Sequence, residues 1–161
     1  MMQDGHAILQ FITGWLARNG FTGPLIIMGR SLGSAPAIEL AAAYGEQVSG
    51  LIIESGFAQA GPLLQLLGVD PAAIGFREET AFRQLSKIAQ FRKPLLIIHA
   101  EFDHIIPFSD GQALFDASAA ADKTLLKIPG ADHNNILAHA LGEYLAAIQR
   151  FTSLCLTHRK S

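Results

Sequence analysis

Charged residues are scarce in this chain. Lys, Arg, Asp and Glu together make up 16% of the 161 residues, against about 25% in an average domain. Half of the residues are hydrophobic. An intrinsically disordered chain needs low hydrophobicity and high net charge, so this composition excludes one. The length is that of a single domain, and we expect residues 1–161 to form one.

Basic clusters and cysteine pairs are also missing. The net charge is −2, and Lys and Arg do not gather anywhere except in a short basic tail at residues 158–160. A nucleic-acid partner is therefore not expected, because its electrostatic footprint is absent. The single cysteine, Cys155, cannot form an internal disulfide. It lies in an apolar helical pattern, which favours a packing role.

Long apolar runs are absent as well. No stretch reaches the roughly 18–20 apolar residues that span a bilayer. The first residues, Met-Met-Gln-Asp-Gly-His, have neither the charged start nor the apolar core of a signal peptide. These two absences predict a cytoplasmic protein without a membrane span.

Short apolar runs and helical patterns alternate along the chain. The apolar runs are typical of strands buried on both faces, and they occupy residues 25–28, 48–53, 95–99 and 124–128. Helical patterns occupy residues 4–19, 32–44, 109–121 and 134–156, with Ser109 as a plausible N-cap. Strands that alternate with helices indicate an α/β fold: a parallel sheet of about four strands with helices on both faces.

Two segments of this pattern have distinctive features. The first predicted helix is amphipathic, with apolar side chains at helical spacing: Ile8, Phe11, Ile12, Trp15 and Leu16. Residues 56–91 separate the second and third strands, and a crossover needs only about a dozen residues. We therefore predict a helical cap insertion at about 56–91.

The first predicted strand runs directly into the pentapeptide Gly29-Arg30-Ser31-Leu32-Gly33. A Gly-x-Ser-x-Gly sequence between a buried strand and a helix is typical of a nucleophile elbow. Gly29 and Gly33 allow the sharp turn that exposes the hydroxyl of Ser31. The backbone N–H of Leu32, at the start of the helix, can then face a developing oxyanion. An ordinary structural turn is the alternative.

An acid and a base follow the last two predicted strands. Asp103 lies just after the third strand and His133 just after the fourth. Both are therefore expected at the carboxyl edge of the sheet, where open parallel sheets bind ligands. A serine nucleophile needs a base that an acid orients. The chain order Ser31, Asp103, His133 is that of the α/β-hydrolase arrangement.

With these motifs the sequence resembles the α/β-hydrolase superfamily, and within it the serine hydrolases of the α/β hydrolase domain-containing protein 17 and Bem46-like group. The matching segments are Leu25–Met28 with Gly-Arg-Ser-Leu-Gly-Ser at 29–34, Glu-Ser-Gly-Phe at 54–57, Phe-Asp-His-Ile-Ile-Pro at 102–107 and Gly-Ala-Asp-His-Asn at 130–134. The resemblance implies Ser31 as nucleophile, His133 as general base and acid, and Asp103 as the acid that fixes the imidazole. It also implies that residues 56–91 cover an acyl pocket.

The chain departs from this family before the nucleophile strand. Members of the family carry several strands there and a His-Gly-type loop that supplies a second oxyanion donor, and residues 1–24 match neither. We therefore expect only half of the oxyanion hole. We also expect the first strand to have an unpaired apolar edge through which the protein forms a homo-oligomer.

Other roles for nearby polar residues remain open. Glu54, at the end of the second strand, is an alternative acid, although the loop of Asp103 matches the family better. Asp132 lies beside His133 and more simply caps the last helix. Arg30 could line the pocket mouth, contact a leaving group or form a surface salt bridge.

The remaining histidines offer little chemistry. His99, His104 and His139 are interpreted as loop or core residues. A metal site would combine Asp103, His104, Asp132 and His133, but these have no recognised ligand spacing. We expect neither a metal nor another cofactor.

The sequence thus predicts a serine hydrolase of carboxylesterase or thioesterase type that acts on a small-molecule acyl substrate through an acyl-enzyme. The alternative is a truncated, weakly active or inactive hydrolase fragment that is stable as an oligomer.

Overall fold

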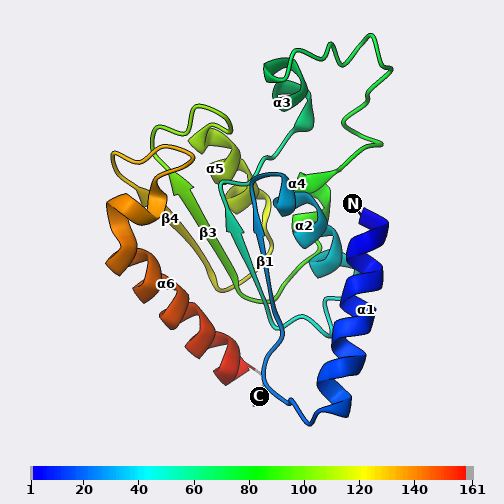
Figure 1. Ribbon diagram of the computed structural model, residues 1–161, viewed down its shortest axis with the longest axis vertical. Helices are drawn as coiled ribbons and strands as arrows, with labels where there is room; N and C mark the ends of the chain where they lie inside the picture. The colour runs from blue at the N-terminus through cyan, green and yellow to red at the C-terminus, as the bar shows by residue number, and fades with distance from the viewer. Residues whose placement is uncertain (1, 159–161) are drawn as a thin grey trace.

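A parallel sheet of four strands stands between two layers of helices in the computed structural model, which describes residues 2–158 (Figure 1). Met1 and residues 159–161, with Arg159 and Lys160 of the basic tail, lie outside the described residues. The strands lie side by side in chain order and all pairs are parallel. The predicted α/β fold with a parallel sheet is therefore confirmed.

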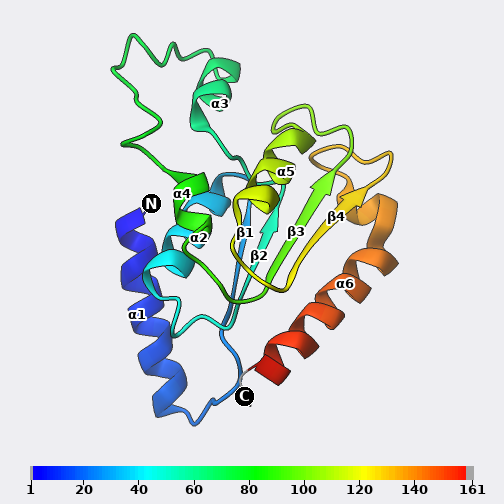
Figure 2. The ribbon, with the colours of Figure 1, turned by 180° about the vertical axis from the view of Figure 1, so that it is seen from behind.

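The strands are β1 (Ile26–Arg30), β2 (Gly50–Glu54), β3 (Leu95–Ala100) and β4 (Lys123–Ile128). The helices are α1 (Met2–Arg18), α2 (Ser34–Ala43), α3 (Ala60–Leu66), α4 (Gln84–Ile88), α5 (Phe108–Ala117) and α6 (Ile136–His158), and a 3₁₀ turn (Ser31–Gly33) joins β1 to α2. All carboxyl ends of the strands point the same way, so the loops after them meet at one edge (Figure 2).

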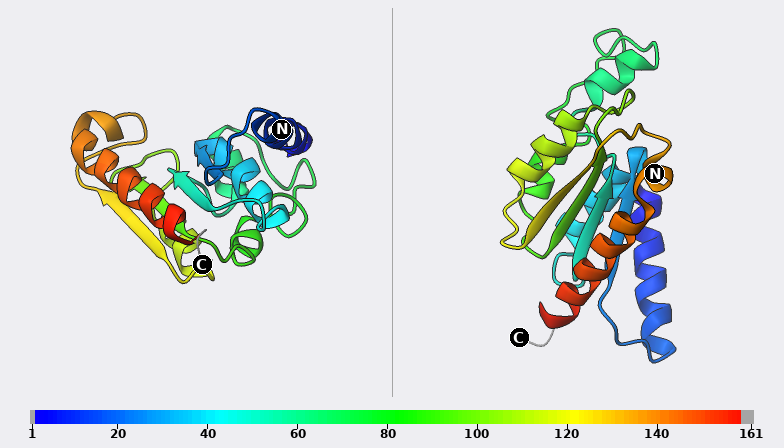
Figure 3. Two further views of the ribbon diagram at one scale, coloured as in Figure 1. Left: turned by 90° about the horizontal axis from the view of Figure 1, so that it is seen from below. Right: turned by 90° about the vertical axis from the view of Figure 1, so that its left-hand side faces the viewer.

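The central strands β2 and β3 are buried along their whole length. Their side chains point alternately to the two faces of the sheet and pack into two separate hydrophobic cores, one on each face. Ile53 and Ile97 pack with α2, α4 and α5, whereas Ile52 and Ile98 pack with α6. Figure 3 shows α6 alone on its face of the sheet. Burying each such side chain contributes about 1.5–3 kcal/mol, which explains the nearly unbroken apolar runs in the sequence.

Cys155 is a packing residue of the α6 layer. Its side chain is fully buried, and a Cβ added to Gly50 of β2 would lie 2.5 Å from its Sγ. Burial raises the pKa of the Cys155 thiol to about 11, so the thiol stays protonated at neutral pH. The expected packing role is therefore confirmed.

The outer strand β1 is less covered than the sequence predicts, and the apolar stripe of α1 is largely exposed. Met28 is 47% exposed, so β1 is not buried on both faces. Of the apolar stripe on α1, Phe11 is 64% and Trp15 is 43% exposed, whereas Leu9 is buried and α1 packs on α2 near Gly5. Among residues 2–158, no further strand pairs with the outer edge of β1.

The inserted segment at 56–91 divides into two parts. α3 and the loop that follows it project beyond the carboxyl edge of the sheet (Figure 1). The carboxylate of Glu78 in this loop accepts hydrogen bonds from the N–H groups of Ala60 (2.8 Å) and Gly61 (3.0 Å) at the start of α3. α4 packs against α2 and α5 and so belongs to the main helical layer. Only the part of the predicted cap insertion that precedes α4 therefore lies where a cap over the carboxyl edge would be.

Two helix starts differ from the sequence prediction. α5 begins at Phe108 after Pro107, and no side chain caps it, so Ser109 is not its N-cap. Asp132 does not cap α6 directly, because its Oδ1 accepts from the N–H of Asn134, two residues before the helix begins. Asp132 orders the turn that leads into α6. The helix itself is kinked at Ala140.

Candidate active site

Ser31 follows the last residue of β1 and begins the 3₁₀ turn that leads into α2. Its backbone is left-handed, with φ of 52°, a conformation that costs a non-glycine residue about 1 kcal/mol or more. Such strain at a strand-to-helix turn is the mark of a nucleophile elbow. Leu32, whose backbone N–H is the expected oxyanion donor, is the next residue in the turn.

The two glycines of the turn, Gly29 and Gly33, differ in how much space a side chain would have. A Cβ on Gly29 would lie 2.5 Å from the Cβ of Ala37 and still closer to the carbonyl oxygen of Gly33. Gly29 is therefore required by the close approach of α2 to β1. A Cβ on Gly33 would meet nothing within 4 Å, and its φ of −67° suits any residue. Packing alone does not explain Gly33.

The structure brings Ser31, His133 and Asp103 together at the carboxyl edge of the sheet. Nε2 of His133 lies 3.1 Å from the hydroxyl oxygen of Ser31, and Nδ1 lies 2.7 Å from Oδ2 of Asp103. With its proton on Nδ1, the imidazole donates to Asp103 and leaves Nε2 free to accept the proton of Ser31. Asp103 and His133 are both buried.

The other carboxylate oxygen of Asp103 is held by its own loop. Oδ1 accepts hydrogen bonds from the backbone N–H of Ile106 (2.8 Å) and Ile105 (3.0 Å). Burial opposes ionisation, but the N–H donors of Ile106 and His133 outweigh it and hold the pKa of Asp103 below its ordinary value. Asp103 is therefore a carboxylate at neutral pH.

His99 supports this loop from the end of β3. Its side chain is fully buried, and Nε2 lies 2.8 Å from the carbonyl oxygen of Ile106. Burial lowers the pKa of His99, against the raising effect of that hydrogen bond. The ring is therefore neutral at pH 7 and donates from Nε2. The interpretation of His99 as a core histidine is confirmed, and His104 and His139 are exposed.

Glu54 forms its hydrogen bonds with residues other than His133. Its Oε1 accepts from Nε of Arg30 (2.8 Å) and its Oε2 from the hydroxyl of Tyr144 (2.7 Å). Arg30 also donates from Nη2 to the backbone carbonyl oxygen of His133, at 2.6 Å. In this structure Asp103, and not Glu54, bonds the imidazole.

The sequence did not single out Tyr144. It lies 90 positions from Glu54 in the chain. A signal for it exists: a tyrosine at helical spacing from the buried residues Ala147 and Phe151 of α6 needs a partner for its hydroxyl.

Within residues 2–158, no three or more His, Cys, Asp or Glu side chains form a group that could hold a metal ion. Among the described helices, none has the length and apolar character that crossing a bilayer requires.

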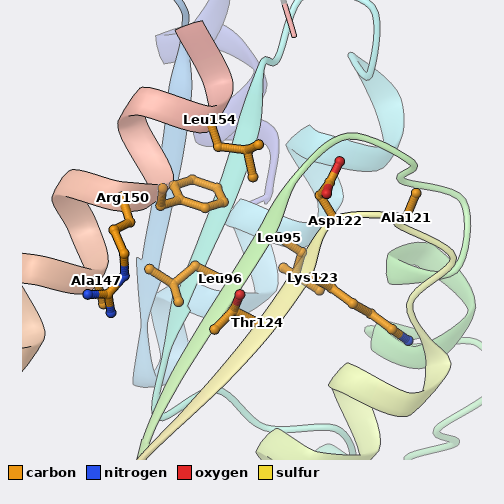
Figure 4. A pocket seen from close by; sticks show the side chains of 10 residues that line it. Leu95, Leu96, Ala121, Asp122, Lys123, Thr124, Ala147, Arg150 and Leu154 are labelled. Carbon is orange, nitrogen blue, oxygen red and sulfur yellow. The ribbon is translucent and has the colours of Figure 1, made fainter. Parts of the chain in front are cut away.

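Two cavities lie on different sides of the fold. One of about 280 Å³ opens between α6 and the starts of β3 and β4, at the end of the sheet opposite Ser31. Figure 4 shows Arg150 and Leu154 of α6 beside Leu95 and Leu96 of β3 in this cavity. Another, of about 210 Å³, lies between α3 and the loop of Asp103, and its apolar lining includes Phe57, Leu63, Leu66, Ile105 and Ile106.

The sequence is similar to those of known α/β hydrolase domain-containing proteins. No protein-family model matches the chain. Human α/β hydrolase domain-containing protein 17B is 33% identical over 133 residues, which cover 80% of this chain and 41% of the relative. Human protein 17C is 32% identical over 133 residues, with 80% and 36% covered. The chain thus spans about two fifths of the length of these curated relatives.

Solved structures with the same fold include an esterase domain from Rhodothermus marinus, with a TM-score of 0.66 and 23% identity over 89% of this chain and 67% of that one. A monoacylglycerol lipase from Paleococcus ferrophilus has a TM-score of 0.66 and 18% identity over 92% of this chain and 75% of that one. The chain therefore has the α/β-hydrolase fold, and its sequence is similar to that of the α/β hydrolase domain-containing protein 17 group.

Proposed function

We propose that this protein is a serine hydrolase of carboxylesterase or thioesterase type. The observation that carries the proposal is the continuous hydrogen-bonded series from Ser31 through His133 to Asp103. Nucleophile, base and orienting acid come from three loops at the ligand-binding edge of the sheet. The names of the similar proteins, hydrolases among the curated relatives and an esterase and a lipase among the structures, support the same class.

The proposed reaction runs through an acyl-enzyme. The Oγ of Ser31 attacks the acyl carbon while Nε2 of His133 takes its proton, and Asp103 stabilises the imidazolium that forms. The backbone N–H of Leu32 stabilises the oxyanion. The proton then passes from Nε2 to the departing alcohol or thiol, and water repeats the sequence to release the acid.

The acyl group is proposed to lie against the cavity between α3 and the loop of Asp103. Its wall is mostly apolar, with Phe57, Leu63 and Ile106 among its residues. Ile106 also donates its backbone N–H to Asp103, so one loop contacts both the cavity and the acid. This surface suits a hydrocarbon chain and not a charged substrate.

A fluorophosphonate probe tests the proposal, because such probes form a covalent adduct only with an activated serine. We expect labelling of the wild-type chain at Ser31, seen by peptide mass spectrometry, and none of Ser31→Ala. Ser109→Ala changes an exposed serine of α5 and should label like the wild type. A folded wild-type protein without an adduct at Ser31 would contradict the function.

We also propose a homo-oligomer, in which weakly active copies pair through β1. Its outer edge has no partner strand within the described part of the chain, and Met28 of β1 is 47% exposed. An unpaired edge with apolar surroundings favours association. Light scattering at micromolar concentration should give a dimer or larger, and Met28→Lys should reduce its mass. A wild-type monomer would contradict the oligomer. A cytoplasmic setting stays a prediction.

A further inference from the structure

A chain of hydrogen bonds ties the candidate base to the body of the fold. It begins at the hydroxyl of Tyr144 in α6, which donates to Oε2 of Glu54 at 2.7 Å. It continues from Oε1 of Glu54 to Nε of Arg30 at 2.8 Å. It ends where Nη2 of Arg30 donates to the carbonyl oxygen of His133 at 2.6 Å. We call these four residues the Arg30 relay.

The relay is built from strong and directed contacts. Glu54 and Tyr144 are buried, and a buried carboxylate is costly unless donors satisfy it. Hydrogen bonds to charged groups are roughly twice as strong as those between neutral groups. The rigid guanidinium of Arg30 holds two acceptors at a fixed angle, which a lysine cannot do.

The relay acts on the two residues that exchange the proton. Arg30 immediately precedes Ser31 in the chain. Its guanidinium donates a hydrogen bond to the backbone of His133, which lies 103 positions away in the sequence. The two ring nitrogens of the imidazole are held by Asp103 and Ser31. The bond to Arg30 adds an anchor on the main chain, just before the kinked helix α6.

We propose that Arg30, held by Glu54 and Tyr144, is a positioning residue that fixes the backbone of His133 relative to Ser31. This inference rests on the proposed function. It assigns Arg30 no contact with substrate, and so differs from a role in binding the leaving group. A displacement of about 1 Å in a reacting group can reduce the rate about 10²-fold.

Kinetics of Arg30→Ala on a p-nitrophenyl ester test the proposal. We expect kcat to fall about 10- to 100-fold with KM within about twofold of the wild type, because orientation and not binding is lost. Millimolar guanidinium should restore part of kcat, since the side chain of Arg30 is 46% exposed and its site is open to solvent. Arg150→Gln removes another exposed arginine, from α6, and should behave like the wild type.

Tyr144→Phe keeps the packing of α6 and removes only the hydroxyl, so it tests the far end of the relay even where Arg30→Ala does not fold. We expect a severalfold smaller kcat and no change in KM. An unchanged kcat in both variants would overturn the proposal, and a rise in KM alone would make Arg30 a substrate contact instead.

A second measurement does not depend on turnover. The Nδ1–H of His133, bonded to Asp103, should give a downfield proton resonance that His133→Gln removes. In Arg30→Ala this resonance should broaden or exchange faster with water, because the loop is no longer anchored, and in Arg150→Gln it should not. A wild type without fluorophosphonate labelling contradicts the hydrolase function alone. An unchanged resonance in Arg30→Ala contradicts the positioning role alone.

Discussion

Nε2 of His99 lies 3.6 Å from Oδ2 of Asp103, and both side chains are fully buried. The same nitrogen donates to the carbonyl oxygen of Ile106, whose backbone N–H in turn donates to Asp103. The candidate acid is therefore held by a loop that a buried neutral histidine supports from β3. The position of His99 in turn depends on α5, because Gly111 lets the helix lie against the imidazole ring.

Gly111→Ala should therefore disturb the candidate site from a distance. The new Cβ would lie 2.5 Å from Nδ1 of His99, in a ring that is fully buried. We expect a loss of about 1–3 kcal/mol in the free energy of unfolding, which is typical of overpacking. Labelling at Ser31 should slow as well, because the loop of Asp103 shifts with the ring. Urea unfolding and probe kinetics measure the two effects.

Gly142→Ala is the matched control, since a Cβ there meets nothing within 4 Å. In the helix α6 the same exchange should stabilise the protein by up to about 1 kcal/mol through helix propensity. Equal stability changes in the two variants would show that the contact with His99 does not matter.

Acidification should destabilise the folded chain through His99. Burial lowers the pKa of His99. Just below about pH 6.5, His99 therefore becomes protonated in the unfolded chain but stays neutral in the folded chain. The free energy of unfolding should then fall as pH drops from 6.5 towards the folded pKa, by at most about 1.4 kcal/mol per pH unit. The lowered pKa of Asp103 adds a further loss only below about pH 4.

His99→Gln should flatten this dependence between pH 7 and pH 5. Chemical denaturation at several pH values gives the slopes. A slope that is the same in His99→Gln as in the wild type would contradict the assignment.

The sheet and the convergence of Ser31, Asp103 and His133 could be predicted from the sequence because each has a local signal. β2 and β3 are buried on both faces and therefore appear as uninterrupted apolar runs. Ser31 lies in a strained turn that needs Gly29, and the pentapeptide at residues 29–33 shows this requirement directly in the sequence. Parallel strands in turn place Asp103 and His133 at one edge.

The contacts that make up the Arg30 relay have no such local signal, although a buried tyrosine in α6 signals that its hydroxyl needs some partner. Glu54 and Tyr144 are separated by 90 positions, and Arg30 and His133 by 103, so their contacts follow only from the packing of α6 on the sheet. The exposure of the apolar stripe on α1 is beyond the sequence for a related reason. Its spacing predicts a helix correctly, but spacing alone does not say which face of a helix the rest of the chain covers.

Asp103→Asn should reduce kcat far more than Glu54→Gln. In the asparagine variant the amide cannot orient and stabilise the imidazolium, and kcat should fall about 10³–10⁴-fold. Glu54 bonds Arg30 and Tyr144 instead of the ring, so its amide variant should lose at most about tenfold through a misplaced relay. Steady-state kinetics on one ester rank the two variants. The reverse ranking would make Glu54 the acid of the site.

Gly29→Ala should prevent the elbow from forming, whereas Gly33→Ala should not. The first places a Cβ 2.5 Å from the Cβ of Ala37 and against the backbone of Gly33, where neither neighbour can rotate away. We expect a loss of about 3 kcal/mol or more in the free energy of unfolding, together with loss of labelling at Ser31. Gly33→Ala enters open space with a helical φ, so its thermal midpoint should equal or exceed that of the wild type. If Gly33→Ala folds normally but labels poorly at Ser31, the space above Gly33 is needed by the probe and so by the substrate. Equal unfolding midpoints for the two variants would contradict the close packing of α2 on β1.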